Sequence, residues 1–201
     1  MDAVPIPNVV ELTPDVKRFL LKYPMIDTGI VLAKREVGRI IRAAEADIAC
    51  QSWFDAKVFR TAVSDRMLQV WDARWRYDVS PGCPWIHFEF SLNWENSYIE
   101  GRLDIEGQRT VPHAVSQAVG TRLAQTIQPH ATGWMQGTGW NIHVPLVSNA
   151  IFLWKRTAIT EDTFSSAWMV AQSREHMNQL ADLIPDINQT VEQIFPHAKK
   201  H

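Results

Sequence analysis

The segment from Trp71 to Glu106 alternates between apolar and polar residues so regularly that it predicts three consecutive β-strands with two unlike faces. We expect one face of this meander to form a core and the other to carry charge. The predicted apolar face consists of Trp71, Ala73, Trp75, Tyr77, Val79, Ile86, Phe88, Phe90, Leu92, Ile99, Leu103 and Ile105. The predicted polar face consists of Asp72, Arg74, Arg76, Asp78, Trp85, His87, Glu89, Ser91, Glu100, Arg102, Asp104 and Glu106.

Helical patterns precede the meander. Thr13 as an N-cap and Pro14 at the first helical position predict a helix that Pro24 ends. A second helix is expected from about Leu32 to Ala49, where apolar residues keep helical spacing. Residues 51–67 have no clear pattern.

More helices and two more strands are expected after the meander. Thr110 and Pro112 predict the start of a third helix that Pro129 closes. The last long helix should begin at Thr160 and be interrupted by Pro185, with Asp186 starting a second helix. The two further strands are expected at 139–147 and 150–159.

This order of elements predicts an α+β fold, in which a three-stranded antiparallel meander and two further strands are covered on one face by helices. At 201 residues, with no linker or repeat, the chain is expected to form a single domain over 1–201. Its predicted parts are N-terminal helices at 13–49, a sheet and helix core at 68–159, and C-terminal helices at 160–196.

Composition narrows the class of protein. A formal net charge of −2 argues against a general nucleic-acid coat protein. Cys50 and Cys83 lie far apart, which suggests neither a disulfide framework nor a zinc site. No secretion signal and no run of 18 apolar residues is visible, so we expect a cytoplasmic protein with no membrane partner. Nine tryptophans favour a core sealed by helices.

The polar face of the meander has three interpretations. The residues that could lie within a few ångströms of one another across adjacent strands are His87, Glu89, Glu100, Arg102, Asp104 and Glu106. Carboxylates grouped in this way could hold Mg²⁺ for phosphodiester chemistry, with His87 or a neighbouring base activating water. Alternatively, Arg74 and Arg76 pair with the carboxylates in a solvated lattice, since opposite charges on neighbouring strands are ordinary sheet stabilisers. The third interpretation is a recognition surface.

The helix–meander–helix order, with a Trp- and Phe-rich central strand, resembles the restriction-endonuclease-like PD-(D/E)XK superfamily. A second point of resemblance is the segment Trp85-Ile86-His87-Phe88-Glu89-Phe90, followed by a strand at Tyr98 to Glu106. The closer resemblance is to non-nuclease accessory regions in bacterial defence proteins, and it covers about 68–195 in outline. It implies a role in phage defence or counter-defence. The nuclease signature of the superfamily needs Glu-x-Lys, whereas Glu89-Phe90-Ser91 and Asp104-Ile105-Glu106 lack the lysine that would position water.

Two other segments are candidates for contacts. The stretch 133–140 contains three glycines with Trp134 and Trp140, and it either forms a ligand-binding lip or bends so that its tryptophans turn inward. The basic residues Lys34, Arg35, Arg39 and Arg42 either meet an acidic partner or form a solvated helix face.

The leading functional hypothesis is a non-enzymatic interaction module without a cofactor, which binds a protein partner or, alternatively, nucleic acid. Its expected binding residues are Arg74, Arg76, Arg102, Trp134 and Trp140. The second hypothesis is a divergent metal-dependent nuclease with Glu89, Asp104 and His87 as catalytic residues and Mg²⁺ as cofactor. The third is a small-ligand sensor with a tryptophan-lined pocket.

Overall fold

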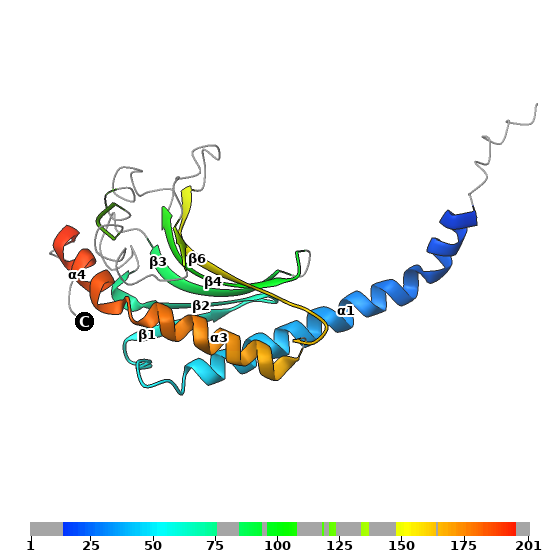
Figure 1. The fold of residues 1–201 in the computed structure, drawn as a ribbon, viewed down its shortest axis with the longest axis horizontal. Coiled ribbons are helices and arrows are strands. Elements are labelled where there is room, and N and C mark those ends of the chain that lie inside the picture. The colour runs from blue at the N-terminus through cyan, green and yellow to red at the C-terminus, as the bar shows by residue number, and fades with distance from the viewer. Residues whose placement is uncertain are drawn as a thin grey trace, which may run out of the picture. The chain divides into compact units, whose positions relative to one another are not determined.

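The structure is a computed structural model that describes residues 14–75, 85–93, 96–107, 118, 121–123, 134–136, 148–163 and 165–195. The chain divides into two units, Met1–Glu36 and Val37–His201. Its helices and strands, labelled as in Figure 1, are α1 (Pro14–Ile48), β1 (Phe59–Val63), β2 (Met67–Asp72), the 3-10 turn η1 (Ala73–Trp75), β3 (Trp85–Asn93), β4 (Tyr98–Gly107), β5 (Met135–Gln136), β6 (Ser148–Ala158), α3 (Ser166–Ala181) and α4 (Ile184–Ile194).

The described part of the first unit, from Pro14 to Glu36, is helical throughout and belongs to α1. Because α1 continues without a break to Ile48, the prediction that Pro24 ends a first helix is wrong. A proline inside a helix removes one backbone donor, and the hydrogen bonds of the flanking residues can carry the helix past it. The expected N-cap, Thr13, lies outside the described residues.

The second unit is built on one antiparallel sheet with the strand order β1-β2-β3-β4-β6-β5. The α+β class with an antiparallel sheet is therefore confirmed. The meander includes one strand more than expected, because β1 forms within residues 51–67, where the sequence has no clear pattern. Figure 1 shows that the sheet is curved and that α3 runs along one of its faces.

The first predicted strand needs a correction. The strand observed in this region is β2, which ends at Asp72. The chain then turns through η1 and does not continue as a strand through Ala73–Trp75. Val70 pairs with Phe88, so alternation places Trp71 on the opposite face of the sheet, together with Gln69. Trp71 is buried nonetheless. Trp75 reaches the core through the 3-10 turn, a change of backbone conformation that period-two alternation cannot represent.

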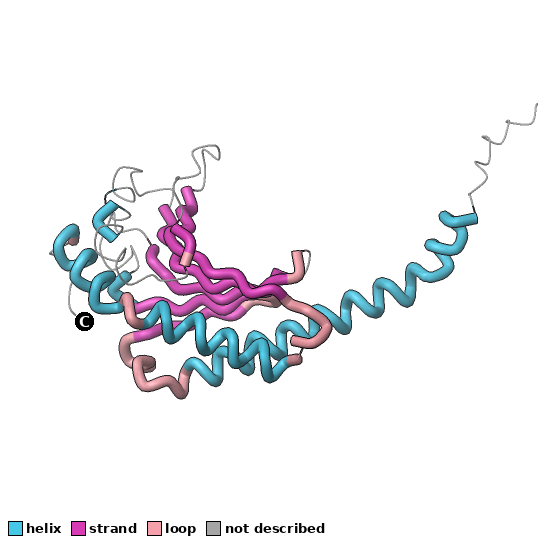
Figure 2. The backbone as a smooth tube through the Cα atoms, in the orientation of Figure 1, coloured by secondary structure: helices cyan, strands magenta, loops and turns pink. Residues whose placement is uncertain are grey.

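In the second unit the sheet forms one layer and the helices packed on it form the other (Figure 2). The hydrophobic core lies between these two layers. All six residues expected to be buried, Trp71, Trp75, Phe88, Phe90, Leu103 and Ile105, belong to one hydrophobic cluster. The cluster also includes Ile41 from α1 and Met177 from α3. The rings of Trp75 and Phe88 meet edge to face at 5.3 Å between centroids.

The C-terminal helices begin at other residues than predicted. The N-cap of α3 is Ser165, whose side chain accepts from Trp168 N, whereas Thr160 lies in a turn and hydrogen-bonds with Thr163. The predicted interruption near Pro185 is confirmed. However, the N-cap of α4 is Leu183 and makes no side-chain cap, so Asp186 only occupies the first turn of the helix.

Of the two further strands, the one expected at 150–159 is confirmed as β6, while 139–147 lies outside the described residues. The third predicted helix also lies mostly outside them, although residues 118 and 121–123 are helical and Leu123 is buried in the core. Within the described ranges, none of the helices combines the length and apolar composition that a membrane crossing requires.

Candidate functional site

The sheet face opposite the helix-covered core brings polar side chains from four strands together. In the β3–β4 register His87 lies opposite Asp104, and Glu89 lies opposite Arg102. We call this surface the polar face. By strand alternation it carries Gln69, Trp71, His87, Glu89, Tyr98, Glu100, Arg102, Asp104, Trp154 and Arg156. Cross-strand neighbours on one face lie close enough for their side chains to interact directly.

The acidic residues of the polar face are buried, so the interpretation as a solvated lattice is wrong. His87, Glu89, Glu100 and Asp104 are each at most 3% exposed. Ionised carboxylates at this depth require charged partners or hydrogen bonds, because desolvation of an unpaired charge is expensive. Among the described residues, the arginines that pair with these carboxylates are Arg102 and Arg156. The sequence interpretation named Arg74 and Arg76 as the partners, but Arg74 pairs with Asp72, and Arg76 lies outside the described residues.

Arg102 is the centre of these ion pairs. Its Nη2 donates to Glu89 Oε1, its Nη1 to Glu100 Oε1 at 3.3 Å, and its Nε lies 3.0 Å from Asp104 Oδ2. One guanidinium therefore serves three carboxylates on two strands. We call Glu89, Glu100, Arg102, Asp104 and Arg156 the charge network.

Arg156 of β6 extends the charge network to a third strand. Its Nε donates to Glu100 Oε2 at 2.5 Å, and its guanidinium carbon lies 4.6 Å from the centre of the Tyr98 ring. The ring and the carboxylate together hold the guanidinium in one orientation. The side chain is nevertheless 47% exposed, so it presents a fixed cationic group at the surface.

The charge network also sets protonation states. Burial raises the pKa of Glu89, but His87 and Arg102 beside it lower that pKa by more, so Glu89 is held ionised. Burial lowers the pKa of Arg102, and the carboxylates of Asp104, Glu89 and Glu100 outweigh this effect and raise it above its usual value. The hydrogen bond to Glu100 raises the pKa of Arg156.

His87, Glu89 and Asp104 converge, as the nuclease hypothesis required. One ligand atom from each lies within 4.8 Å of the other two. His87 Nε2 is 3.7 Å from Glu89 Oε2 and 3.8 Å from Asp104 Oδ2. The side-chain nitrogen of Gln69 lies 3.1 Å from His87 Nε2 and donates to Glu89 Oε2 at 3.2 Å. An imidazole nitrogen and carboxylate oxygens are common ligand atoms of divalent metal ions.

The predicted binding residues occupy different environments. Arg74 pairs with the buried Asp72 at 2.5 Å and also donates to Asn188 of α4. Trp134 is half-buried, and its indole nitrogen donates to Gln179 Oε1. Its ring centre lies 5.9 Å from the ring centre of His176, so Trp134 packs inward against α3. Arg102 belongs to the charge network. Arg76 and Trp140 lie outside the described residues.

Sequence reasoning did not single out Gln69, Trp154 or Arg156 as parts of this site. Arg156 and Trp154 lie on a strand that was predicted, but their pairing with β4 depends on which strand is its neighbour. Gln69 precedes the predicted start of the first strand. The sequence feature that could have placed Trp154 and Arg156 on one face is the alternation of side chains along the strand predicted at 150–159, which is β6.

The chain was also compared with known proteins. No protein-family model matches it, and no match is found among curated proteins or solved structures.

Proposed function

We propose that this chain is a non-enzymatic interaction module that binds an acidic protein surface through arginines of the polar face. The observation that carries the proposal is an asymmetry within the ion pairs. In each of these two pairs the carboxylate is buried and the arginine side chain is more exposed: 22% of the Arg102 side chain is exposed against 2% of Glu89, and 47% of Arg156 against 4% of Glu100.

This asymmetry favours recognition of anions. A guanidinium that is already oriented by a buried carboxylate loses little conformational entropy when a partner binds. Arginine also has five donors, of which the internal pair uses only some, so outward-facing donors can meet a carboxylate of the partner. The resemblance of the 85–106 segment to defence-associated accessory regions adds the expectation that the partner belongs to bacterial phage defence.

The same contacts count against the nuclease hypothesis. The carboxylates Glu89 and Asp104 are engaged by Arg102, and the sequence has no lysine at the Glu-x-Lys position. Catalysis of phosphodiester cleavage requires an open, water-accessible metal position, whereas His87, Glu89 and Asp104 are almost fully buried. Purified protein should therefore leave plasmid DNA intact in Mg²⁺ or Mn²⁺. Cleavage that disappears in both Glu89→Ala and Asp104→Ala would overturn the non-enzymatic assignment.

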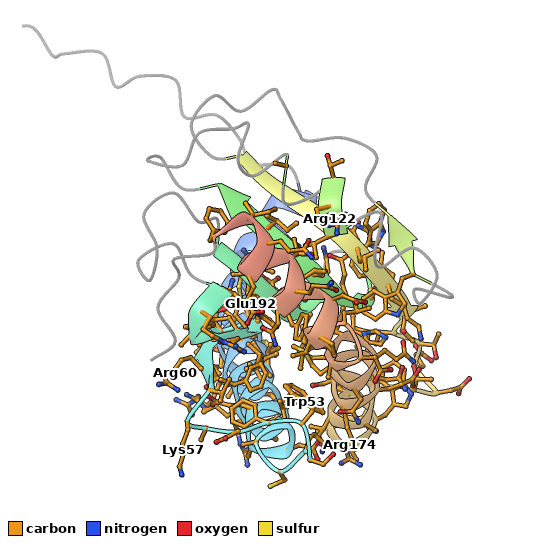
Figure 3. All side chains as sticks on the ribbon, turned by 90° about the vertical axis from the view of Figure 1, so that its left-hand side faces the viewer. Trp53, Lys57, Arg60, Arg122, Arg174 and Glu192 are labelled. Carbon is orange, nitrogen blue, oxygen red and sulfur yellow. The ribbon has the colours of Figure 1, made fainter. Side chains whose placement is uncertain are left out.

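Binding is tested by fluorescence anisotropy with labelled poly-L-glutamate as the acidic probe and oligo(dT) as the nucleic-acid probe, at two salt concentrations. We expect tighter binding to poly-L-glutamate, weakened by salt, and a loss of about fivefold or more in Arg156→Gln. The matched control is Lys57→Gln, which removes an exposed cation located just before β1 (Figure 3) and should change affinity less than twofold.

Two outcomes would contradict the proposal. Equal losses in Arg156→Gln and Lys57→Gln would mean that only net charge matters and that the polar face has no special part. Stronger binding of oligo(dT) than of poly-L-glutamate would assign the surface to nucleic acid.

A further inference from the structure

The donors at the centre of the polar face have the geometry of ligands to one ion. The distances from His87 Nε2 to Glu89 Oε2 and Asp104 Oδ2, 3.7 and 3.8 Å, are longer than hydrogen bonds. Two atoms that bind the same ion at 2.0–2.6 Å are themselves about 3–4 Å apart. The distances from His87 Nε2 to the two carboxylate oxygens therefore correspond to neighbouring positions in a coordination shell, and all three ligand atoms lie within 4.8 Å of one another.

We infer that His87, Glu89 and Asp104 form a site for a divalent transition-metal ion, for which Arg102 is a built-in competitor. An imidazole nitrogen selects transition metals over Mg²⁺ and Ca²⁺, which prefer an all-oxygen shell. All three ligand residues are buried, as in structural metal sites, which are closed to substrate. The inference thus concerns a structural ion and goes beyond the proposed binding function.

Arg102 and a metal ion would compete because they would contact the same carboxylates. Arg102 Nε lies 3.0 Å from Asp104 Oδ2, the oxygen that also faces His87, and Arg102 Nη2 donates to the other oxygen of Glu89. A guanidinium and a metal dication so close together would repel each other strongly at low dielectric. Metal binding therefore requires Arg102 to withdraw from these two carboxylates, while Glu100, which already accepts from Arg102 Nη1, remains as its partner.

Gln69 is placed to complete the shell. Its side-chain amide contacts both His87 Nε2 and Glu89 Oε2, within 3.2 Å of each. The nitrogen and oxygen of such an amide are assigned from hydrogen bonding, and rotation of the amide by 180° would turn an oxygen toward the ion. Amide oxygens are ordinary ligands of divalent metals.

The test uses tag-free full-length protein and Mn²⁺, whose electron paramagnetic resonance signal reports the free ion. We expect one saturable Mn²⁺ per chain. Arg102→Met should bind Mn²⁺ at least tenfold more tightly than the unaltered protein, because the competing cation is removed. Glu89→Gln, which keeps the size of the side chain, should bind at least tenfold more weakly. The matched control is Glu175→Gln on α3, an exposed carboxylate outside the site, which should leave the affinity unchanged.

Stability provides a second readout that does not depend on the resonance signal. Removing Arg102 leaves carboxylates buried without their cation, so the Arg102→Met variant should have a lower melting temperature than the unaltered protein. Adding Mn²⁺ should raise the melting temperature of this variant by more than it raises that of the unaltered protein. Absence of saturable binding in both proteins would overturn the inference. So would equal affinity in the Glu89→Gln and Glu175→Gln variants, since ions would then bind elsewhere.

Discussion

Gly101 of β4 and His176 of α3 are in direct contact, and the absence of a side chain at position 101 makes room for the imidazole. A Cβ atom at Gly101 would lie 2.7 Å from both Cβ and Nδ1 of His176. Such a distance is far inside van der Waals contact, and the His176 atoms involved are close to its own backbone. This pair therefore sets how closely α3 approaches the sheet.

Replacing Gly101 with alanine should destabilise the protein by about 1–3 kcal/mol, because the added methyl group forces α3 and β4 apart. Chemical denaturation monitored by circular dichroism measures the change. Gly38→Ala is the matched control, since a Cβ there meets only the end of the Arg42 side chain at 3.5 Å. In the interior of α1 that substitution should stabilise by about 0.5–1 kcal/mol. Equal effects at the two positions would show that the Gly101–His176 contact is not tight.

The stability of the protein should fall as pH is lowered from about 6.5 to about 4. Burial, and to a smaller extent Lys155, lowers the pKa of His176 from 6.5 to about 4, while Glu175 opposes this shift. Between these values the unfolded chain binds a proton that the folded chain does not, so unfolding is favoured as pH falls. The full loss is on the order of 3 kcal/mol and is complete below pH 4.

The variant that isolates this effect is His176→Gln, which keeps a polar group near Thr157, the hydrogen-bond partner of His176 Nε2. The free energy of unfolding, measured by urea denaturation from pH 7.5 to 4, should decline less steeply in the variant. Identical slopes would mean that His176 takes up its proton in the folded state as readily as in the unfolded chain.

Truncation of Phe88 to alanine should cost about 3–5 kcal/mol, as is typical for deletion of a core aromatic residue. Phe88 is fully buried and its ring packs against Trp75. Val58→Ala, at a half-buried position beside the core, should cost clearly less. A loss below about 1 kcal/mol for Phe88→Ala, measured by denaturant titration, would contradict the assignment of this sheet face to the core.

Neutralising Glu100 should destabilise the protein by about 1–3 kcal/mol, because Arg102 and Arg156 each lose a charged hydrogen-bond acceptor, although Arg102 keeps Glu89 and Asp104 and Arg156 is half exposed. We propose Glu100→Gln, with Glu175→Gln as the comparison. Glu175 pairs with Lys155 at the surface, where solvent screening keeps an ion pair below about 1 kcal/mol. Thermal melts should therefore separate the two variants by several degrees. Similar melting temperatures would show that the charge network adds little to folding.

The alternation of apolar and polar residues correctly predicted the faces of β3 and β4. The alternation of 86–92 and 99–105 correctly assigned Phe88 and Leu103 to the core and Glu89 and Asp104 to the other face, because side chains of a strand alternate whatever the strand pairs with. The same argument failed at Trp71, because Trp75 reaches the core through the turn η1 and therefore does not share the alternation of the strand that contains Trp71.

Helix boundaries were less predictable from sequence. Pro24 and Thr160 are strong local signals for the end and the start of a helix, but α1 continues past Pro24 and α3 begins only after Ser165. Each signal is worth about 1–3 kcal/mol in isolation, which the rest of the fold can outweigh.

By itself, the sequence determined the α+β class, the two unlike faces of the strands at 86–92 and 99–105, and the charged residues of β3 and β4 that share one face. The tertiary structure decided that these charges are buried, that Arg102 and Arg156 rather than Arg74 neutralise them, and that His87, Glu89 and Asp104 converge. The physical reason is that alternation is a property of a single strand, whereas burial and ion pairing depend on which strands become neighbours. In this chain the pairing of β4 with β6, from a distant part of the sequence, supplies Arg156.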